Sequence, residues 1–122
     1  MNDASELIRQ FVEQYKYPVV IADLDHIIRY LNKAACDKYA KRGFPDLENS
    51  SLLDCHNANS VQMIKDIVAK MKDGLDEVYL ATTKENQKVF MTSIRNERGE
   101  LIGYSERFED IHDNTPPAAA DY

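Results

Sequence analysis

Cys55 and His56 carry the most reactive side chains in this sequence, and they are adjacent. They lie in an irregular segment that ends at Ser60, where a helical pattern begins. A thiol beside an imidazolium has a lowered pKa and can act as a redox sensor. A neutral imidazole can bind iron through a ring nitrogen, contact a bound molecule, or donate a hydrogen bond to a loop carbonyl. The residue types alone leave these roles open.

Other metal and catalytic chemistry has little support in the sequence. The side chains of adjacent residues such as Cys55 and His56 usually diverge, and no further Cys or His lies at zinc-like spacing. The motifs of covalently attached haem, of Gly-x-Ser-x-Gly hydrolases and of phosphate-binding loops are absent. We therefore expect no enzyme activity. We also expect His26, in a turn, and His112, at a strand end, to be solvated.

The overall composition limits the class of protein. A chain of 122 residues has the length of one domain, and 43% hydrophobic with 30% charged residues is typical of a globular protein. The net charge of −6 opposes binding to nucleic acid or to an anionic membrane surface, since both require basic patches. No signal peptide and no apolar run of about 20 residues is visible, so we expect a cytoplasmic protein with reduced cysteines.

The elements that must position these side chains follow from the hydrophobic pattern. Helical spacing predicts helices over residues 4–15, 33–40 and 60–71, and a single turn around 51–53. Runs of β-branched and aromatic residues predict strands over 18–23, 27–31, 77–83, 88–95 and 101–110. Because the later helices gather between the second and third strands, we predict an α+β fold. It consists of a five-stranded antiparallel sheet with helices over one face.

The first predicted helix is amphipathic, and its N-cap is expected at Asp3 or Ser5. Its apolar face consists of Leu7, Ile8, Phe11, Val12 and Tyr15. This face either packs on the same domain or forms a homodimer. The chain thus divides into an N-terminal amphipathic helix (1–15), a domain (16–112) and a tail (113–122) that has nothing to bury and is expected to be disordered.

Two motifs, taken in order, resemble the PAS family. The first is Asp-Leu-Asp-His-Ile-Ile-Arg-Tyr-Leu-Asn-Lys-Ala-Ala, over residues 23–35. The second begins at Gly99 and ends in Asp-Ile-His at 110–112, which is similar to the Asp-Ile-Thr that ends the family's domain and usually couples it to an output helix. The resemblance covers residues 16–112. His26 stands where the family usually has Gly, so we expect a different geometry for the first turn.

A finer resemblance involves the segment that carries the thiol and the imidazole. Cys55, His56 and Ser60 match a Cys-His-Pro-Pro-x-Ser element of a subgroup of bacterial PAS domains, some of them in proteins that also carry iron-binding helical domains. Asn57 and Ala58 replace the two prolines of that element.

The resemblance implies a sensory domain for signal transduction, with a pocket between the inner face of the sheet and the covering helices. Haem b is the most specific ligand implied, with His56 as the iron ligand and Cys55 beside it. The predicted apolar lining consists of Val61, Ile64, Val68, Met71, Tyr79, Phe90 and Met91. The candidates for contact with the haem propionates are Arg29, Arg95 and Arg107.

Other interpretations stay open. The pocket can hold a different apolar small molecule that His56 or Cys55 merely contacts. In a purely structural interpretation, Ser60 is the helix N-cap, Cys55 is a buried apolar residue and His56 donates to a loop carbonyl. The domain is then a ligand-free module for dimerisation or for interaction with a partner protein. A separate alternative is a redox sensor through Cys55. In a ligand sensor, occupancy of the pocket changes homodimerisation through the helix over 4–15, or binding of a signalling partner.

Overall fold

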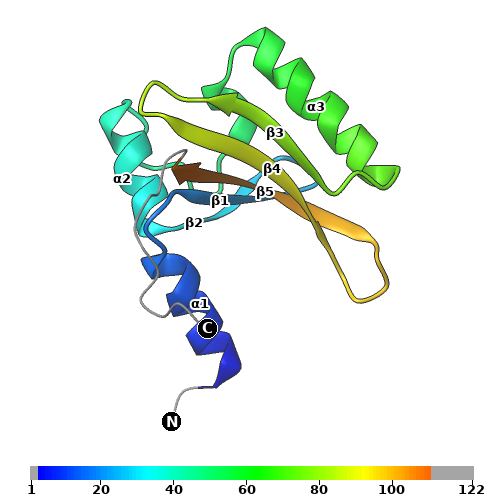
Figure 1. The fold of residues 1–122 in the computed structure, drawn as a ribbon, viewed down its shortest axis with the longest axis horizontal. Coiled ribbons are helices and arrows are strands. Elements are labelled where there is room, and N and C mark those ends of the chain that lie inside the picture. Colours follow the sequence, from blue (N-terminus) through cyan, green and yellow to red (C-terminus); the bar gives the residue numbers. More distant parts are fainter. Residues whose placement is uncertain (1–2, 111–122) are drawn as a thin grey trace, which may run out of the picture.

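The structure, a computed structural model, describes residues 3–110 apart from the side chain of Cys55. Its helices are α1 (Ala4–Gln14), α2 (Lys33–Lys41) and α3 (Ala58–Lys72), with a 3-10 turn, η1 (Leu52–Cys55). Its strands are β1 (Val19–Asp23), β2 (Ile28–Leu31), β3 (Glu77–Thr82), β4 (Gln87–Arg95) and β5 (Leu101–Asp110). The strands form one antiparallel sheet of order β2-β1-β5-β4-β3 (Figure 1). This arrangement confirms the predicted α+β fold. The predictions for His112 and for the tail over 113–122 lie outside the described residues.

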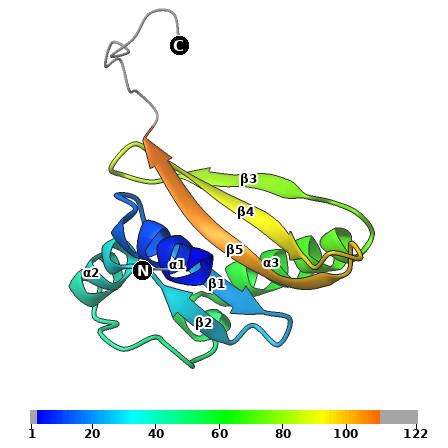
Figure 2. The same cartoon turned by 90° about the horizontal axis from the view of Figure 1, so that it is seen from below.

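The helices lie on two sides of the sheet. α2 and α3 cover the inner face, and α1 lies on the other side (Figures 1 and 2). None of the helices in the described part of the chain has the length and apolar character that crossing a bilayer requires. The buried core between the inner face and its helices includes Val20, Ala22, Ile64, Ile67, Val68, Met71, Met91 and Tyr104.

The start of α3 differs by two residues from the prediction. Asn57 is the N-cap, because its side-chain oxygen accepts a hydrogen bond from the backbone N–H of Ser60 at 2.9 Å. The interpretation of Ser60 as the cap was therefore wrong. The asparagine that replaces a proline of the family element takes that role, and Ser60 lies inside the first turn of the helix.

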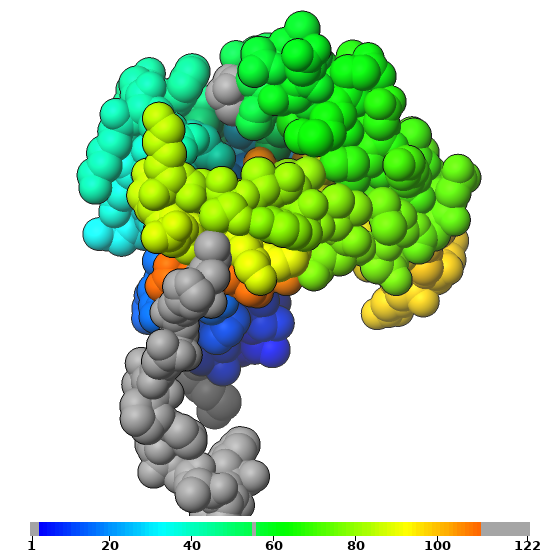
Figure 3. Space-filling view, turned by 45° about the horizontal axis from the view of Figure 1, so that its top comes forward, coloured from blue at the N-terminus to red at the C-terminus, as the bar shows by residue number. Residues whose placement is uncertain are grey.

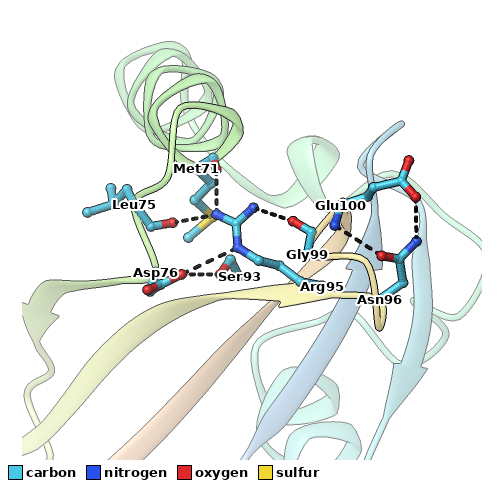
Figure 4. A network of polar contacts seen from close by, with 8 residues as sticks. All are labelled: Met71, Leu75, Asp76, Ser93, Arg95, Asn96, Gly99 and Glu100. Carbon is cyan, nitrogen blue, oxygen red and sulfur yellow. Dashed lines mark hydrogen bonds and ion pairs between the residues drawn. The ribbon is translucent and has the colours of Figure 1, made fainter.

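Arg95 ties the other end of α3 to the sheet. Its guanidinium donates to the carbonyl oxygens of Met71 at 2.6 Å, of Leu75 at 3.3 Å and of Gly99 at 3.3 Å (Figure 4). A carboxylate oxygen of Asp76 accepts from its Nε at 3.4 Å. The bond to Met71 adds to the one that its carbonyl accepts from the backbone N–H of Gly74 at 3.1 Å, and the positive charge favours the negative end of the helix dipole.

Asn32 joins α1 to the rest of the domain. It is fully buried, and its Oδ1 accepts from the backbone N–H groups of Val19 at 2.9 Å and of Ala35 at 3.0 Å, so that it also caps α2. Its Nδ2 donates to the carbonyls of Val12 at 3.1 Å, Tyr15 at 3.3 Å and Tyr17 at 2.9 Å. One buried amide thus fixes the C-terminal end of α1, the start of β1 and the start of α2.

His26 occupies the turn before β2 in a left-handed conformation, with φ of 64°. The expectation of a different turn geometry was wrong, since His26 takes the backbone conformation that a glycine favours. The expectation of a solvated ring was also wrong. The ring is half-buried, and its Nδ1 lies 2.8 Å from the hydroxyl of the fully buried Tyr104, an interaction that holds the side chain in place. Burial lowers the pKa of this imidazole.

Candidate ligand-binding cavity

A cavity of about 290 Å³ lies between α2, α3 and the inner face of the sheet. Figure 3 shows its opening between α2, α3 and β3. The lining is mostly apolar, with a few polar groups, as is usual for a small-molecule site. The lining residues are Tyr39, Arg42, Phe44, His56, Ser60, Met63, Ile64, Leu80, Ala81, Thr83, Val89, Glu106 and Phe108.

Glu106 is the most unusual of these residues. It lies on the inner face of β5, between Val20 of β1 and Met91 of β4, and only 8% of it is exposed. No hydrogen bond joins its carboxyl group to any residue within 3–110, so its oxygens are available to the contents of the cavity. Burial raises the pKa of Glu106 to about 7, against the opposing effect of the positive charge of Arg42.

His56 supplies a second unpaired polar group. It follows η1 as the C-cap residue, and its Nε2 is buried without a hydrogen-bond partner among the described residues. Burial, and secondly the charge of Arg42, lowers the pKa of this imidazole below its usual 6.5. The ring is therefore neutral at neutral pH, and the state of its Nε2, donor or acceptor, depends on the tautomer.

Arg42 provides the positive charge at this site. It is the C-cap residue of α2, it is exposed, and its guanidinium carbon lies 6.0 Å from the centre of the Tyr39 ring. Its charge favours the ionised form of Glu106 and the neutral form of His56. The cavity thus combines an apolar interior, a buried carboxyl, a neutral imidazole and one solvated cation.

The structure brings only part of the predicted lining to this cavity. His56 and Ile64 line it. Val68, Met71 and Met91 are buried in the core beside it, and Val61 is half-buried. The lining does not include these four residues.

The prediction of Tyr79 and Phe90 as lining residues was wrong. The register pairs Tyr79 with Phe90, and Phe90 with Arg107, on the outer face of the sheet. There the guanidinium of Arg107 lies 4.7 Å from the centre of the Phe90 ring. Neighbouring residues of a strand point to opposite faces of the sheet. A bulge between Tyr79 and Ala81 interrupts this alternation in β3, so the sequence alone does not show which face each residue occupies.

The three arginines predicted to contact propionates are all engaged elsewhere. Arg29 pairs with Asp23 at 2.8 Å, and Arg107 pairs with Glu77 at 3.0 Å. Arg95 is bound to the end of α3, as described above. Arg42 and Glu106, which both line the cavity, were not predicted as site residues. Glu106 had a detectable signal, because it stands at an inward position of a strand whose other inward residues are aromatic.

Haem does not fit the cavity as the structure has it. The unpaired Nε2 of His56 meets one requirement, that of an axial ligand. The cavity is too small for haem, because its volume of about 290 Å³ is just below the roughly 300–1,000 Å³ of ligand sites, and a tetrapyrrole is a large ligand. The buried carboxyl of Glu106 also opposes the anionic propionates.

Two further predictions concern metal and redox chemistry. Within the described residues, no group of three or more His, Cys, Asp or Glu side chains is arranged to hold a metal ion. Cys36 is an exposed free thiol whose pKa is raised by burial and by the nearby carboxylates of Glu13, Asp37 and Glu48. The side chain of Cys55 lies outside the described residues, so its redox role stays a prediction.

Comparisons by sequence find no match: no protein-family model and no curated protein matches the chain. Comparisons by structure find similar proteins. The PAS domain of a protein from Colwellia psychrerythraea is 15% identical with a TM-score of 0.67, and the match covers 89% of this chain and 98% of that one.

Two proteins of Vibrio cholerae are also similar. A sensory box sensor histidine kinase is 14% identical with a TM-score of 0.61, over 88% of this chain and 92% of that one. The Aer2 receptor, described as a dual PAS-haem oxygen sensor, is 21% identical with a TM-score of 0.54, over 79% of this chain and 95% of that one. These similarities show the fold of the chain.

Proposed function

We propose that this chain, which has the PAS fold, is a sensory domain that binds a small molecule in the cavity between α2, α3 and the sheet. The observation that carries the proposal is the placement of two polar groups at one mostly apolar cavity. These are the buried carboxyl of Glu106 and the Nε2 of His56, which has no hydrogen-bond partner among the described residues. Leaving a buried polar group without a partner costs about 1–3 kcal/mol, more for a charge. A ligand that bonds these groups offsets that cost.

Native mass spectrometry of the purified protein tests this proposal directly. We expect a copurifying molecule, or a rise in melting temperature with members of a small-molecule library, and a loss of both effects in His56→Ala. Glu48→Ala, at an exposed position outside the cavity lining, serves as the control. Protein that carries nothing and responds to no compound in the library would contradict the proposal.

We propose further that a homodimer formed through α1 reads out the state of the cavity. The helix buries none of its residues, and Leu7, Ile8 and Phe11 are 60%, 63% and 69% exposed. A contiguous apolar surface of this kind is unusual on a monomer. A groove on the outer face of the sheet, lined by Phe11, Val12, Tyr15, Val19, Ile21, Ile94, Ser105, Arg107 and Glu109, continues this surface.

A second copy of the chain is the expected occupant, because one amphipathic helix can pair with its own symmetry mate through the same face. Light scattering after size-exclusion chromatography measures the result. Phe11→Glu is expected to give monomers, whereas Gln10→Glu, on the neighbouring polar face, adds the same charge and is expected to leave the dimer intact. A wild-type monomer at high protein concentration would refute the dimer.

Haem is a second candidate ligand, and it is favoured by two observations. These are the unpaired Nε2 of His56 and the similarity to the Aer2 receptor. It requires the cavity to widen. A Soret band in purified protein that is absent in His56→Ala supports haem, and colourless protein that takes up no added hemin excludes it.

A further inference from the structure

We propose that the cavity selects small organic cations, and that Glu106 is the residue that binds their ammonium group. This inference rests on the proposed ligand site and names the chemical class of its ligand. Glu106 is more than nine-tenths buried and lines the cavity, and within the described residues no hydrogen bond or ion pair engages its carboxylate. An ammonium group placed against it provides both the opposite charge and N–H donors.

Neither of the two cationic side chains near the cavity, Arg42 and Lys38, takes the place of the ammonium group. Arg42 contributes a favourable charge but makes no hydrogen bond to Glu106, and it is exposed to solvent. Lys38 of α2 lies over the ring of Phe108, with its Nζ 4.5 Å from the ring centre, and is not a lining residue. Among the described residues, the carboxylate of Glu106 therefore has no cationic side chain bonded to it.

The remaining polar groups fit an ammonium as well. His56 is neutral at neutral pH, so its Nε2 can accept a hydrogen bond in the tautomer that carries the proton on Nδ1. The hydroxyl groups of Ser60 and Thr83 at the cavity can also accept. An ammonium with three N–H donors can bond to several such acceptors at once.

The volume and the apolar lining define the body of the ligand. About 290 Å³ equals the volume of roughly ten water molecules at about 30 Å³ each. Met63, Ile64, Leu80 and Val89 surround this space with apolar atoms. The geometry therefore fits a compact aliphatic or alicyclic amine of about ten non-hydrogen atoms, and not an extended polyamine.

The proposal predicts a specific pH dependence. The charged or titratable residues of the lining are Tyr39 of α2, Arg42 at its C-cap, His56 before α3 and Glu106 itself. The lining residues from α3, β3 and β4 carry no titratable group. Glu106 has a pKa of about 7, and an alkylammonium stays protonated to about pH 10. Binding of the cation requires the ionised carboxylate, so the affinity is expected to rise about tenfold from pH 6 to pH 8.

Isothermal titration with three compounds of one shape tests the inference: cyclohexylamine, cyclohexanol and cyclohexanecarboxylate. At pH 8 we expect the amine to bind at least about tenfold more tightly than the alcohol, and the carboxylate not to bind. Glu106→Gln is expected to abolish both the preference for the amine and its pH dependence. Glu97→Gln, in the exposed β4–β5 turn, removes the same charge from the surface and is expected to retain both.

The outcomes separate this inference from the proposed function. Equal binding of the amine and the alcohol leaves a ligand site in place and overturns the selection of cations. A pH dependence that persists in Glu106→Gln assigns it to His56 and overturns the role of Glu106. Failure of all three compounds, together with the absence of any copurifying molecule, overturns the proposed site itself. If Glu106→Gln does not fold, the comparison of amine and alcohol in the wild-type protein at pH 6 and pH 8 decides the question.

Discussion

The buried carboxyl of Glu106 is expected to make the stability of the folded domain fall as the pH rises through neutrality. The pKa of Glu106 is about 7 in the folded protein, against 4.5 for a glutamate in an unfolded chain. Between these values the folded state binds more protons than the unfolded state, so the free energy of unfolding decreases with increasing pH. The contribution is fully favourable below about pH 4.5 and is lost above about pH 7.

The magnitude follows from the two pKa values. The proton affinity differs by a factor of a few hundred, and each factor of ten corresponds to about 1.4 kcal/mol, which gives about 3 kcal/mol. The side chain is more than nine-tenths buried, so solvent screening does not reduce this figure greatly. Such a loss is a large fraction of the stability of a small domain.

Urea denaturation of the wild-type protein and of Glu106→Gln across pH 4.5 to 8 measures this effect. His26 and His56 have lowered pKa values, so each makes the protein less stable on acidification, but their contributions cancel in the difference between the two proteins. Relative to the wild type, the variant should gain about 3 kcal/mol between the ends of the range. Glu97→Gln controls for the loss of a surface charge. A difference between wild type and Glu106→Gln that stays constant with pH would refute the reasoning.

Three further substitutions test the contacts that hold the elements together. Asn32→Asp keeps the acceptor oxygen that caps α2 but replaces the three hydrogen bonds donated by Nδ2 with a buried charge. We expect the free energy of unfolding in urea to fall by about 3 kcal/mol or more, and hydrogen exchange to be fastest in α1. Arg95→Ala removes the charged donor that the carbonyls of Met71 and Leu75 share and should cost about 2 kcal/mol. Arg95→Lys lacks the planar fork and should fail to restore most of this loss. Gly103→Ala would place a Cβ atom 2.5 Å from the carbonyl oxygen of Ala22, so circular dichroism melting should show a fall of at least about 5 °C. A melting temperature equal to that of the wild type would mean that β1 and β5 shift apart without cost.

Much of the fold follows from local sequence signals. Each end of the five strands and three helices lies within two residues of its predicted position. The reason is that β-branched runs, helical spacing and the Asn32 cap all act over short distances. The left-handed turn at His26 was not predicted, since its conformation is fixed by contact with Tyr104, which is 78 residues away in the sequence.

The site was predicted less well because it depends on which face of a strand each residue occupies. His56, which precedes the long helix, lines the cavity, and its role as a ligand-binding residue stays a prediction. Tyr79 and Phe90 were assigned to the lining because they are aromatic, but the register turns them outward. Glu106 was overlooked because a glutamate in a strand is usually solvated, and only the pairing of β5 with both β1 and β4 makes its position buried.

The same strand connects the two proposed surfaces. In β5, Glu106 faces the cavity, while its neighbours Ser105 and Arg107 face the outer groove beside α1. A ligand that draws the carboxylate of Glu106 inward displaces a strand that is hydrogen-bonded on both sides, so the movement must reach the outer face through the backbone. Asn32 fixes α1 to the start of β1, the neighbour of β5 in the sheet. If occupancy changes the affinity of the dimer, linkage requires that dimerisation change ligand affinity by the same factor, so dilution of the protein must alter the measured binding constant.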